Sequence, residues 1–303
     1  MLKINRLQFI AINRAVFLNI SHRFEKDPAY GEIMRRFRMG HLTKDDIHTI
    51  NTRFIKNSNV SLPSLPQIRC ACYMNDERNA YNNVVFLKHL QATHQQTEDK
   101  SIDCPNHTCI LKATMTYQGK ALNKTMYNRI LDECGDSDVT NGSDTFVDPA
   151  LKFFHNIPLM MNTNERIEEK LANGTPCRGL YVQLKSNCNF RKENWEGYMV
   201  NTIYANEVDY LVCMHESNRN YFLIKPETRQ CKIRFRMWNN MILKKIRTTY
   251  LPIICNISTT GHKLQGKTLD HLVINSFAYN CTHWVYVVLS RVRQLDNLIL
   301  NQK

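Results

Sequence analysis

The sequence lacks any apolar run that approaches the ~20 residues needed to cross a membrane, although 43% of its 303 residues are hydrophobic. The amino-terminal stretch MLKINRLQFIAINRAVFL is interrupted by Arg6, Asn13 and Arg14, which argues against a secretory signal peptide. Eleven cysteines without such a signal indicate reduced thiols rather than a disulfide framework. We therefore expect an intracellular globular protein of one or two domains with no membrane partner, nuclear or mitochondrial if the source is eukaryotic.

Acidic residues are scarce relative to basic ones. The 27 Asp and Glu stand against 40 Lys and Arg, which gives a net charge of +13. This excess favours a polyanionic partner such as nucleic acid, because lysines and arginines that neutralise phosphates release counterions. A basic soluble protein without such a partner is the alternative that charge alone leaves open.

The paired Cys-x-x-Cys spacing of zinc knuckles is also missing. The tight groupings are Cys70-x-Cys72 and Cys104-x-x-His107-x-Cys109. A zinc site at Cys104, His107 and Cys109 stays open as an alternative to unligated thiols in a loop or core.

The segment TTGHKLQGKT, Thr259–Thr268, fits a phosphate-binding signature, because Gly261–Thr268 satisfies G-x-x-x-x-G-K-T. Such a loop follows a buried strand and opens a helix. The preceding run LPIICNIS predicts the strand, but the following LVINSF predicts a second strand in place of the helix. We expect the match to be accidental, with Lys267 solvated and Thr268 structural. A phosphate-loop kinase or NTPase that depends on Lys267 is kept as a rival hypothesis.

Helical signals are clearest in the first third of the chain. One helix is predicted to begin after Asp27-Pro28 and to end at Gly40, and a second to be capped by Thr43 with Asp46 in the capping-box position. A third pattern runs through ERNAYNNVVFLKHL. The faces predicted from the 3.6-residue period are Tyr30, Ile33, Met34 and Phe37 in the first helix; Ile47, Ile50 and Phe54 in the second; Tyr81, Val84, Val85 and Lys88 in the third.

Strand signals dominate the second half of the chain. The polar composition of residues 91–148 predicts an insertion or loop region rather than a core element. From Phe153 onward, short strands are predicted in LMMNTN, CRGLYVQL, VNTIYA, VDYLVCM, YFLIK and CKIRFRM, with a turn at Asn173-Gly174. This density predicts a small antiparallel barrel inserted between stretches of α/β character.

Several segments resemble, in order, the motifs of superfamily-one helicases of the Pif and RecD type. WVYVVLSRVRQLDNLIL, residues 284–300, resembles the sixth motif, and TTGHKLQGKTLDHLVI resembles the fifth at a fitting spacing. SHRFEKDPAYG, residues 21–31, resembles the fourth motif, RRFRMGHLTKDDIHTIN the helical pair after it, and IPLMMNTNERIEEKLANGTPCRGLYV the start of the inserted barrel. The resemblance covers about residues 15–300, is weakest across 91–148, and is nearest to helicases of Helitron-like transposons.

The resemblance implies an α/β fold, in which a second RecA-like helicase domain, with a parallel sheet flanked by helices, carries an inserted SH3-like β-barrel. The RecA-like domain would comprise residues 1–153 and 250–303, with 91–148 as a polar insertion, and the barrel would comprise residues 154–249. The family's first motif, its acidic Asp-Glu strand end and its third motif are missing from the sequence. We therefore expect a carboxyl-terminal half, as in a fragment, a truncated gene model or a degenerate element copy, with the first RecA-like domain encoded upstream.

By the resemblance, Arg23 and Arg291 would be catalytic and would reach the γ-phosphate of ATP. A planar guanidinium suits this task because it stays charged and offers several fixed donors. The alternative is that both are ordinary ion-pair residues. Two departures weaken the transfer: Phe24 stands where the family commonly has Gln, and Gly261 stands where it has a β-branched residue. We expect Gly261 to loosen the local turn.

The remaining site residues also follow from the resemblance. Gln265 and Gly266 would lie at the nucleotide edge of the cleft and share cofactor binding with the two arginines. Thr260, His262 and Lys263 would contact backbone phosphates of DNA, which positions a strand without reading its sequence. A packed or capping role is the alternative for His262.

The function expected from these motifs is the carboxyl-terminal part of an ATP-dependent DNA helicase, which couples ATP hydrolysis to single-strand translocation and duplex unwinding. Its partners would be single-stranded DNA and single-strand/duplex junctions, in repair, recombination or telomere maintenance. ATP and Mg²⁺ would bind only together with the first domain, so the isolated chain is expected to be inactive as an ATPase. The alternative is an ATP-independent, basic single-stranded nucleic-acid-binding or transposon-accessory module. Translocation polarity and DNA against RNA preference stay open.

Overall fold

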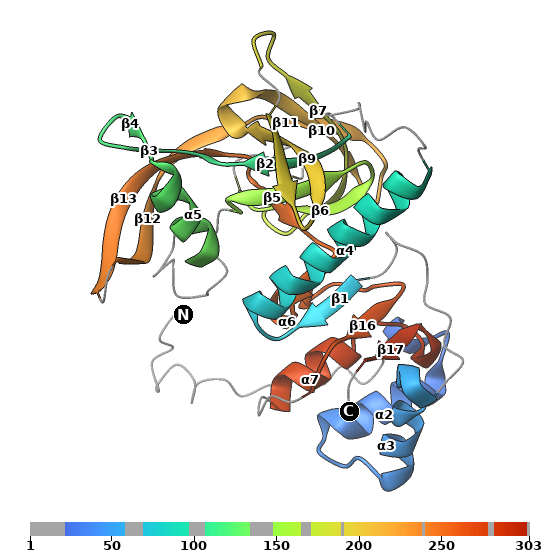
Figure 1. Cartoon of the computed structure of the whole chain (residues 1–303). Coiled ribbons are helices and arrows are strands. Elements are labelled where there is room, and N and C mark those ends of the chain that lie inside the picture. Colours follow the sequence, from blue (N-terminus) through green and yellow to red (C-terminus); the bar gives the residue numbers. More distant parts are fainter. Residues whose placement is uncertain are drawn as a thin grey trace, which may run out of the picture.

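The computed structural model describes residues 22–57, 69–96, 107–133, 148–164, 171–188, 191–237, 240–277 and 282–301. These residues combine a parallel sheet with several mostly antiparallel sheets that lie on the other side of one long helix (Figure 1). Within these ranges, no helix is both long and apolar enough to span a membrane.

The parallel sheet has the strand order β15-β1-β16-β17. Its strands are β1 Arg69–Cys72, β15 Ser258–Thr260, β16 Leu272–Ile274 and β17 Leu298–Leu300. Cys70 pairs with Ser258 on one side and with Val273 on the other, and every pairing in this sheet is parallel. The predicted α/β architecture, with a parallel sheet flanked by helices, is confirmed at this level.

Successive side chains of each strand point to opposite sides of the sheet, and helices cover both sides. The face toward α4 (Asn75–Gln96) is formed by Cys70, Cys72, Val273 and Ile299. The opposite face packs against α2 (Pro28–Arg38), α3 (Lys44–Asn51) and α7 (Thr282–Leu289), and consists of Ala71, Leu272, Ile274, Leu298 and Leu300. Burial on both sides explains why β16 and β17 are apolar throughout rather than alternating.

Helices α2 and α3 form where the sequence predicts them. The Asp27 carboxylate caps α2, and Thr43 and Asp46 form the predicted reciprocal capping box on α3. Arg36 donates to both oxygens of Asp46 at 2.5 and 2.8 Å, and with the Thr43 N–H it holds the pKa of that carboxyl well below its ordinary value. The predicted inward position of Ile47 is wrong, because its side chain is 49% exposed.

Helix α4 is confirmed, but its buried face differs from the predicted one. Val84 is 49% exposed, whereas Val85, Phe86 and Leu90 are buried. Tyr81 packs on the parallel sheet and also on the core of the antiparallel strands. A helix that lies between two layers buries more than one stripe, so a single 3.6-residue period does not describe it.

The other described strands form sheets in the orders β11-β10-β7-β6-β14, β12-β13-β3-β4 and β5-β2-β9-β8. Their bounds are β2 Thr108–Lys112, β3 Thr114–Tyr117, β4 Lys120–Ala121, β5 Ala150–Phe154, β6 Ile157–Met161, β7 Pro176–Leu184, β8 Arg191–Trp195, β9 Tyr198–Tyr204, β10 Val208–His215, β11 Tyr221–Ile224, β12 Glu227–Met237, β13 Asn240–Tyr250 and β14 Ile253–Cys255. The remaining helical segments are η1 His22–Phe24, η2 Ile55–Asn57, α5 Lys124–Glu133, η4 Ala205–Glu207, α6 Gly261–Leu264 and η5 Leu295–Asn297.

The predicted strands after Phe153 correspond to β6, β7, β9, β10, β11 and β12. The predicted turn at Asn173-Gly174 precedes β7, and Gly174 has a φ of +91°, a left-handed conformation that favours glycine. Strands β6 and β7 then pair antiparallel. No sheet closes into a barrel within the described residues.

The prediction that residues 91–148 form a loop region is wrong for the described part of that range. Strand β2 pairs with both β5 and β9. Its Cys109, Ile110 and Leu111 are buried in the core that α4 shares with the antiparallel strands. Strand β3 pairs with β13, and α5 packs on β12. The average composition of residues 91–148 is polar, and it therefore conceals a core strand as short as TCILK.

The run LPIICNIS, predicted as one strand, divides into two strands of different sheets. β14 pairs with β6, whereas β15 pairs with β1. Between them, Asn256 N donates to Pro158 O at 2.9 Å, and Cys70 N donates to Ile257 O at 2.9 Å. The chain therefore passes from the antiparallel region to the parallel sheet over Asn256–Ile257.

Candidate functional site

The segments that resemble the fifth and sixth helicase motifs lie against each other. Strand β15 ends at Thr260, α6 follows directly, and α6 packs against α7 (Figure 1). Beyond α6, Leu269 N donates to Arg291 O at 2.9 Å, and Leu269 forms a parallel bridge with Val292. The carboxyl end of a parallel strand is also the edge of an α/β sheet where ligands commonly bind.

Arg291 follows the last turn of α7, and its side chain is almost fully buried. Its Nε donates to Val287 O at 2.7 Å, and its Nη2 donates to Ser290 Oγ at 2.6 Å. Its Nη1 donates to the carbonyls of Leu264 and Lys267 at 3.3 and 3.4 Å. The guanidinium therefore joins the end of α7 to the turn that follows α6.

Arg23 reaches the same place from η1, in the segment that resembles the fourth motif. Its Nη1 donates to Ser290 O at 2.7 Å. The neighbouring Tyr30 hydroxyl donates to Leu289 O at 2.8 Å, so η1 and α2 are held on the end of α7. Phe24 is buried and packs edge-on against Tyr30, which makes it a core residue with no polar group to offer a nucleotide.

The two guanidinium groups, called the arginine pair below, carry positive charge that their neighbours do not neutralise. Burial lowers the pKa of Arg291, and the nearby charge of Arg23 lowers it further. The acceptors are carbonyl and hydroxyl oxygens, and among the described residues no carboxylate contacts either side chain. The alternative of ordinary surface ion pairs finds no carboxylate partner in the described part of the chain. Paired guanidinium groups in such a setting favour an anion such as phosphate.

Gln265 and Gly266 occupy the exposed turn after α6. Gly266 has a φ of +77°, and Lys267 N donates to Leu264 O at 3.1 Å across the turn. The same stretch supplies two of the carbonyls that hold Arg291. Any shift of this turn therefore alters the support of the arginine pair.

Lys267 is not solvated as predicted. Its side chain is half-buried, and its Nζ donates to Gly174 O at 3.0 Å and lies 3.1 Å from Met160 Sδ. Burial lowers its pKa. Thr268 is exposed, and β16 follows in place of a helix. The phosphate-loop hypothesis fails on both counts, since it requires a Lys267 that faces a ligand and a helix after Thr268.

Thr260, His262 and Lys263 lie at the end of β15 and in α6. Thr260 is half-buried, and the side chain of His262 lies outside what the structure describes. The pKa of Lys263 is lowered to about 8, first by burial and then by the charges of Arg78 and Lys267. The charges of Arg78 and Lys267 act on Lys263, and these three residues are called the cation cluster below.

Gly261 is buried directly against Trp284 of α7. A Cβ atom on Gly261 would lie 2.6 Å from Trp284 Cδ1 and even nearer to Nε1. Only glycine lets the indole close over the start of α6. The prediction that Gly261 loosens this turn is therefore wrong, because the missing side chain permits a tight contact.

The zinc alternative finds no support. Cys104 lies outside the described residues. Cys109 of β2 is buried in the hydrophobic core, and this burial raises the pKa of its thiol. The thiols of Cys70 and Cys72 lie 3.9 Å apart in the sheet face beneath α4. In the part of the chain that the structure describes, no three His, Cys, Asp or Glu side chains are grouped to hold a metal ion.

The sequence prediction missed two residues of this region. Ser290 supports both arginines, through its carbonyl and through its hydroxyl. Ser290 stands beside Arg291, directly after an apolar run, and this position in the sequence could have indicated that it belongs to the site. Arg78 lies early in α4, and its relation to Lys263 arises only from the fold, so the sequence carried no signal for it.

No protein-family model matches the chain, and no curated protein sequence matches it either. Similarity is found among solved structures. The Pif1 helicase from Candida albicans matches with a TM-score of 0.57 and 13% identity, over 98% of this chain and 58% of that chain. The Bacteroides Pif1 helicase in complex with ADP-AlF3 and ssDNA matches with a TM-score of 0.56 and 14% identity, over 94% of this chain and 51% of that chain.

A third structure, Bacteroides Pif1 bound to ssDNA, matches with a TM-score of 0.53 and 14% identity, over 91% of this chain and 49% of that chain. At such identities the similarity shows the fold alone. The chain spans about half the length of these helicases. Over that part, the fold of the chain is similar to that of these Pif1 helicases.

Proposed function

We propose that this chain is the carboxyl-terminal part of an ATP-dependent DNA helicase. The observation that carries the proposal is the arginine pair, which joins the segments resembling the fourth, fifth and sixth motifs and has no carboxylate partner among the described residues. Similarity to Pif1 structures bound to ADP-AlF3 and to ssDNA supports it. The assignment of residues 154–249 to an inserted SH3-like unit is part of the same proposal.

In this proposal, Arg23 and Arg291 face the γ-phosphate of ATP, while Mg²⁺ and the phosphate loop belong to a first RecA-like domain. The guanidinium groups suit phosphate because they are held in place by uncharged acceptors and keep their charge. The turn at Gln265 and Gly266 links this site to α6. Its movement would therefore connect the state of the nucleotide with the grip on DNA.

At the nucleic-acid side, Thr260, His262 and Lys263 contact backbone phosphates. We expect the isolated chain to bind single-stranded DNA with an affinity that falls steeply with salt. Neutralising two or three phosphates gives roughly a 7- to 20-fold loss between about 50 and about 200 mM salt. Fluorescence anisotropy of a labelled single strand measures this loss. Absence of binding at low salt contradicts the proposal.

The lowered pKa of Lys263 predicts a pH dependence of this binding. Because the pKa is about 8, the ammonium is charged at pH 7 and mostly neutral at pH 9, so affinity is expected to fall by up to roughly tenfold. The folded state binds fewer protons than the unfolded state between about pH 8 and the ordinary value of 10.5, so this group makes the fold more stable with rising pH. The titration of Lys263 therefore does not destabilise the fold over this range, so unfolding from this cause does not account for the expected loss of DNA affinity.

Anisotropy titrations across this pH range check the prediction. The matched control is Lys263→Arg, whose guanidinium stays charged and should bind with little pH dependence. Equal pH dependence in wild type and Lys263→Arg refutes a role for Lys263.

The alternative function is an ATP-independent, basic single-stranded nucleic-acid-binding or transposon-accessory module. The net charge of +13 favours it equally. The two functions separate when a first RecA-like domain is joined to the chain. DNA-stimulated ATP hydrolysis that depends on Arg291 supports the helicase, and hydrolysis by the isolated chain contradicts the division of labour between two domains.

A further inference from the structure

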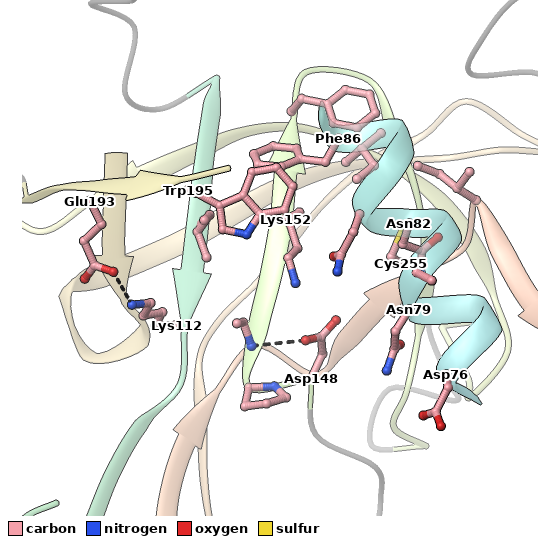
Figure 2. A pocket seen from close by; sticks show the side chains of 18 of the residues that line it. Asp76, Asn79, Asn82, Phe86, Lys112, Asp148, Lys152, Glu193, Trp195 and Cys255 are labelled. Carbon is pink, nitrogen blue, oxygen red and sulfur yellow. Dashed lines mark hydrogen bonds and ion pairs between the residues drawn. The ribbon is translucent and has the colours of Figure 1, made fainter. Parts of the chain in front are cut away.

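A cavity of about 510 Å³ lies between α4 and the antiparallel strands. Figure 2 shows α4 as one wall, with strands of the antiparallel sheets opposite. Its described lining includes neither the arginine pair nor any other site residue that the sequence predicts. A volume of this size accommodates a small organic ligand.

One end of the cavity is aromatic. The rings of Phe86 and Trp195 meet edge to face at 5.2 Å, and Phe86 stacks on Phe154 at 6.5 Å. Trp195 is half-buried, so part of its indole is left for a planar ligand to contact. Stacking of a nucleobase on an aromatic side chain contributes about 1–3 kcal/mol.

The α4 wall is rich in amides, with Asn79, Asn82 and Asn83 along the helix. Ser258 N donates to Asn82 Oδ1 at 3.1 Å, and Ser258 Oγ lies 2.8 Å from the same oxygen, so this amide is fixed with its Nδ2 turned away from Ser258. Lys152 projects from β5 into the same space (Figure 2) and has no hydrogen-bond or ion-pair partner within the described ranges. Amide and ammonium groups match the donor and acceptor pattern of base edges.

The cavity is not suited to a phosphate. Lys112 is neutralised by Glu193, with 2.5 Å between Nζ and Oε2. Asp76 and Asp148 line the other end (Figure 2), so carboxylates outnumber the lysines Lys112 and Lys152. A neutral, planar heterocycle with both donors and acceptors fits this lining better than an anion does.

The carboxylate end of the cavity lies close to the cation cluster. Asp148 and Asp76 both raise the pKa of Arg78, against the larger lowering by burial. Arg78 also donates to Oδ1 of Asn79, which lines the cavity, from Nε at 3.2 Å and from Nη2 at 2.9 Å, and its charge lowers the pKa of Lys263. A strand whose phosphates lie along the cation cluster would therefore run beside the cavity.

We propose that this cavity receives one unstacked nucleobase from a single strand whose phosphates lie along the cation cluster. The base stacks on Trp195 and forms hydrogen bonds with the asparagines and Lys152. The step rests on the nucleic-acid binding proposed above. It adds to the phosphate contacts a contact that depends on the base itself.

The test compares two labelled strands of equal length, one with bases and one entirely abasic, by fluorescence anisotropy. Wild type is expected to bind the base-containing strand about tenfold more tightly, because one stacking contact is gained. Trp195→Ala removes the aromatic wall, and Asn83→Leu places an apolar side chain in the cavity. Both should reduce binding of the base-containing strand to the abasic level and leave abasic binding unchanged.

Val84→Ala is the control, since Val84 is exposed on α4 next to Asn83 and does not line the cavity. A base-dependent difference that survives both cavity variants overturns the proposal, and so does an equal loss on both strands. If wild type binds neither strand, the proposed nucleic-acid binding fails. Saturation-transfer NMR with free adenosine then tests separately whether the cavity binds a base. Transfer that both variants abolish supports it, and no transfer to wild type overturns it.

Discussion

Arg291→Ala is expected to lower DNA-stimulated ATP turnover by roughly 10³-fold or more once a first RecA-like domain is joined to the chain. The guanidinium is fixed by four acceptors, none of them charged. In the proposed function it would therefore present its charge to the phosphate being transferred. Arg23→Ala should also reduce turnover, because Arg23 shares Ser290 with Arg291. Steady-state hydrolysis at saturating single strand measures both effects.

The control for this prediction is Arg293→Ala, which removes an exposed arginine from the same segment. It should change turnover little. Because Arg291 also supports backbone carbonyls, thermal melting of each variant must accompany the kinetics. Arg291→Lys keeps the positive charge but loses the planar guanidinium with its fixed donors. Compared with Arg291→Ala, it should recover thermal stability to a greater extent than ATP turnover. A folded Arg291→Ala enzyme within about tenfold of wild type contradicts the assigned role.

Gly261→Ala is expected to destabilise the fold by about 3 kcal/mol or more, beyond the effect of most single substitutions. The new methyl group would overlap the Trp284 indole, which is itself buried between α6 and α7. Neither partner can move without displacing the helix that carries it. Urea unfolding followed by circular dichroism gives the change in free energy.

Gly40→Ala is the comparison for the same chemical change. Gly40 has a φ of +76°, and a methyl group added there would meet no atom within 4 Å, so only backbone strain of about 1 kcal/mol is expected. The double variant Gly261→Ala with Trp284→Leu should recover part of the loss, because the smaller side chain frees space. Equal costs at Gly261 and Gly40 would show that the indole does not pack on α6.

Local signals in the sequence predicted local structure well. Asp27 and the pair Thr43 and Asp46 start helices through hydrogen bonds within one turn, so nothing distant is needed to interpret them. The turn at Gly174 is of the same kind. Each of these predictions is confirmed because its cause lies within a few residues of its effect.

Predictions that depend on distant partners were less successful. Cys109 lies in a stretch of polar average composition, yet its strand is paired on both sides by segments far along the chain. Lys267 looked solvated because its acceptor, Gly174 O, belongs to a separate hairpin. The division between β14 and β15 is set by which sheet each strand joins, and the apolar run itself does not encode that choice.

For the candidate site, the motif resemblance selected Arg23 and Arg291, and the fold places both at Ser290. The roles of Gln265, Gly266 and Lys263 stay predictions. The cavity beside α4 had no signal in the sequence, because its aromatic and amide walls come from elements that meet only in the folded chain.

The position of β1 in the parallel sheet has a consequence for biosynthesis. Its neighbours β15 and β16 both lie late in the chain, and Cys70 pairs with Ser258 and Val273. At ~5–20 residues per second, a ribosome needs roughly 10–40 s to make the intervening ~190 residues. During that interval the nascent β1 has neither of its neighbouring strands, although α2, α3 and α4, which pack on the faces of the sheet, are already made. This gives chaperones a defined time in which to shield the strand, and makes the parallel sheet the last part of the molecule to assemble.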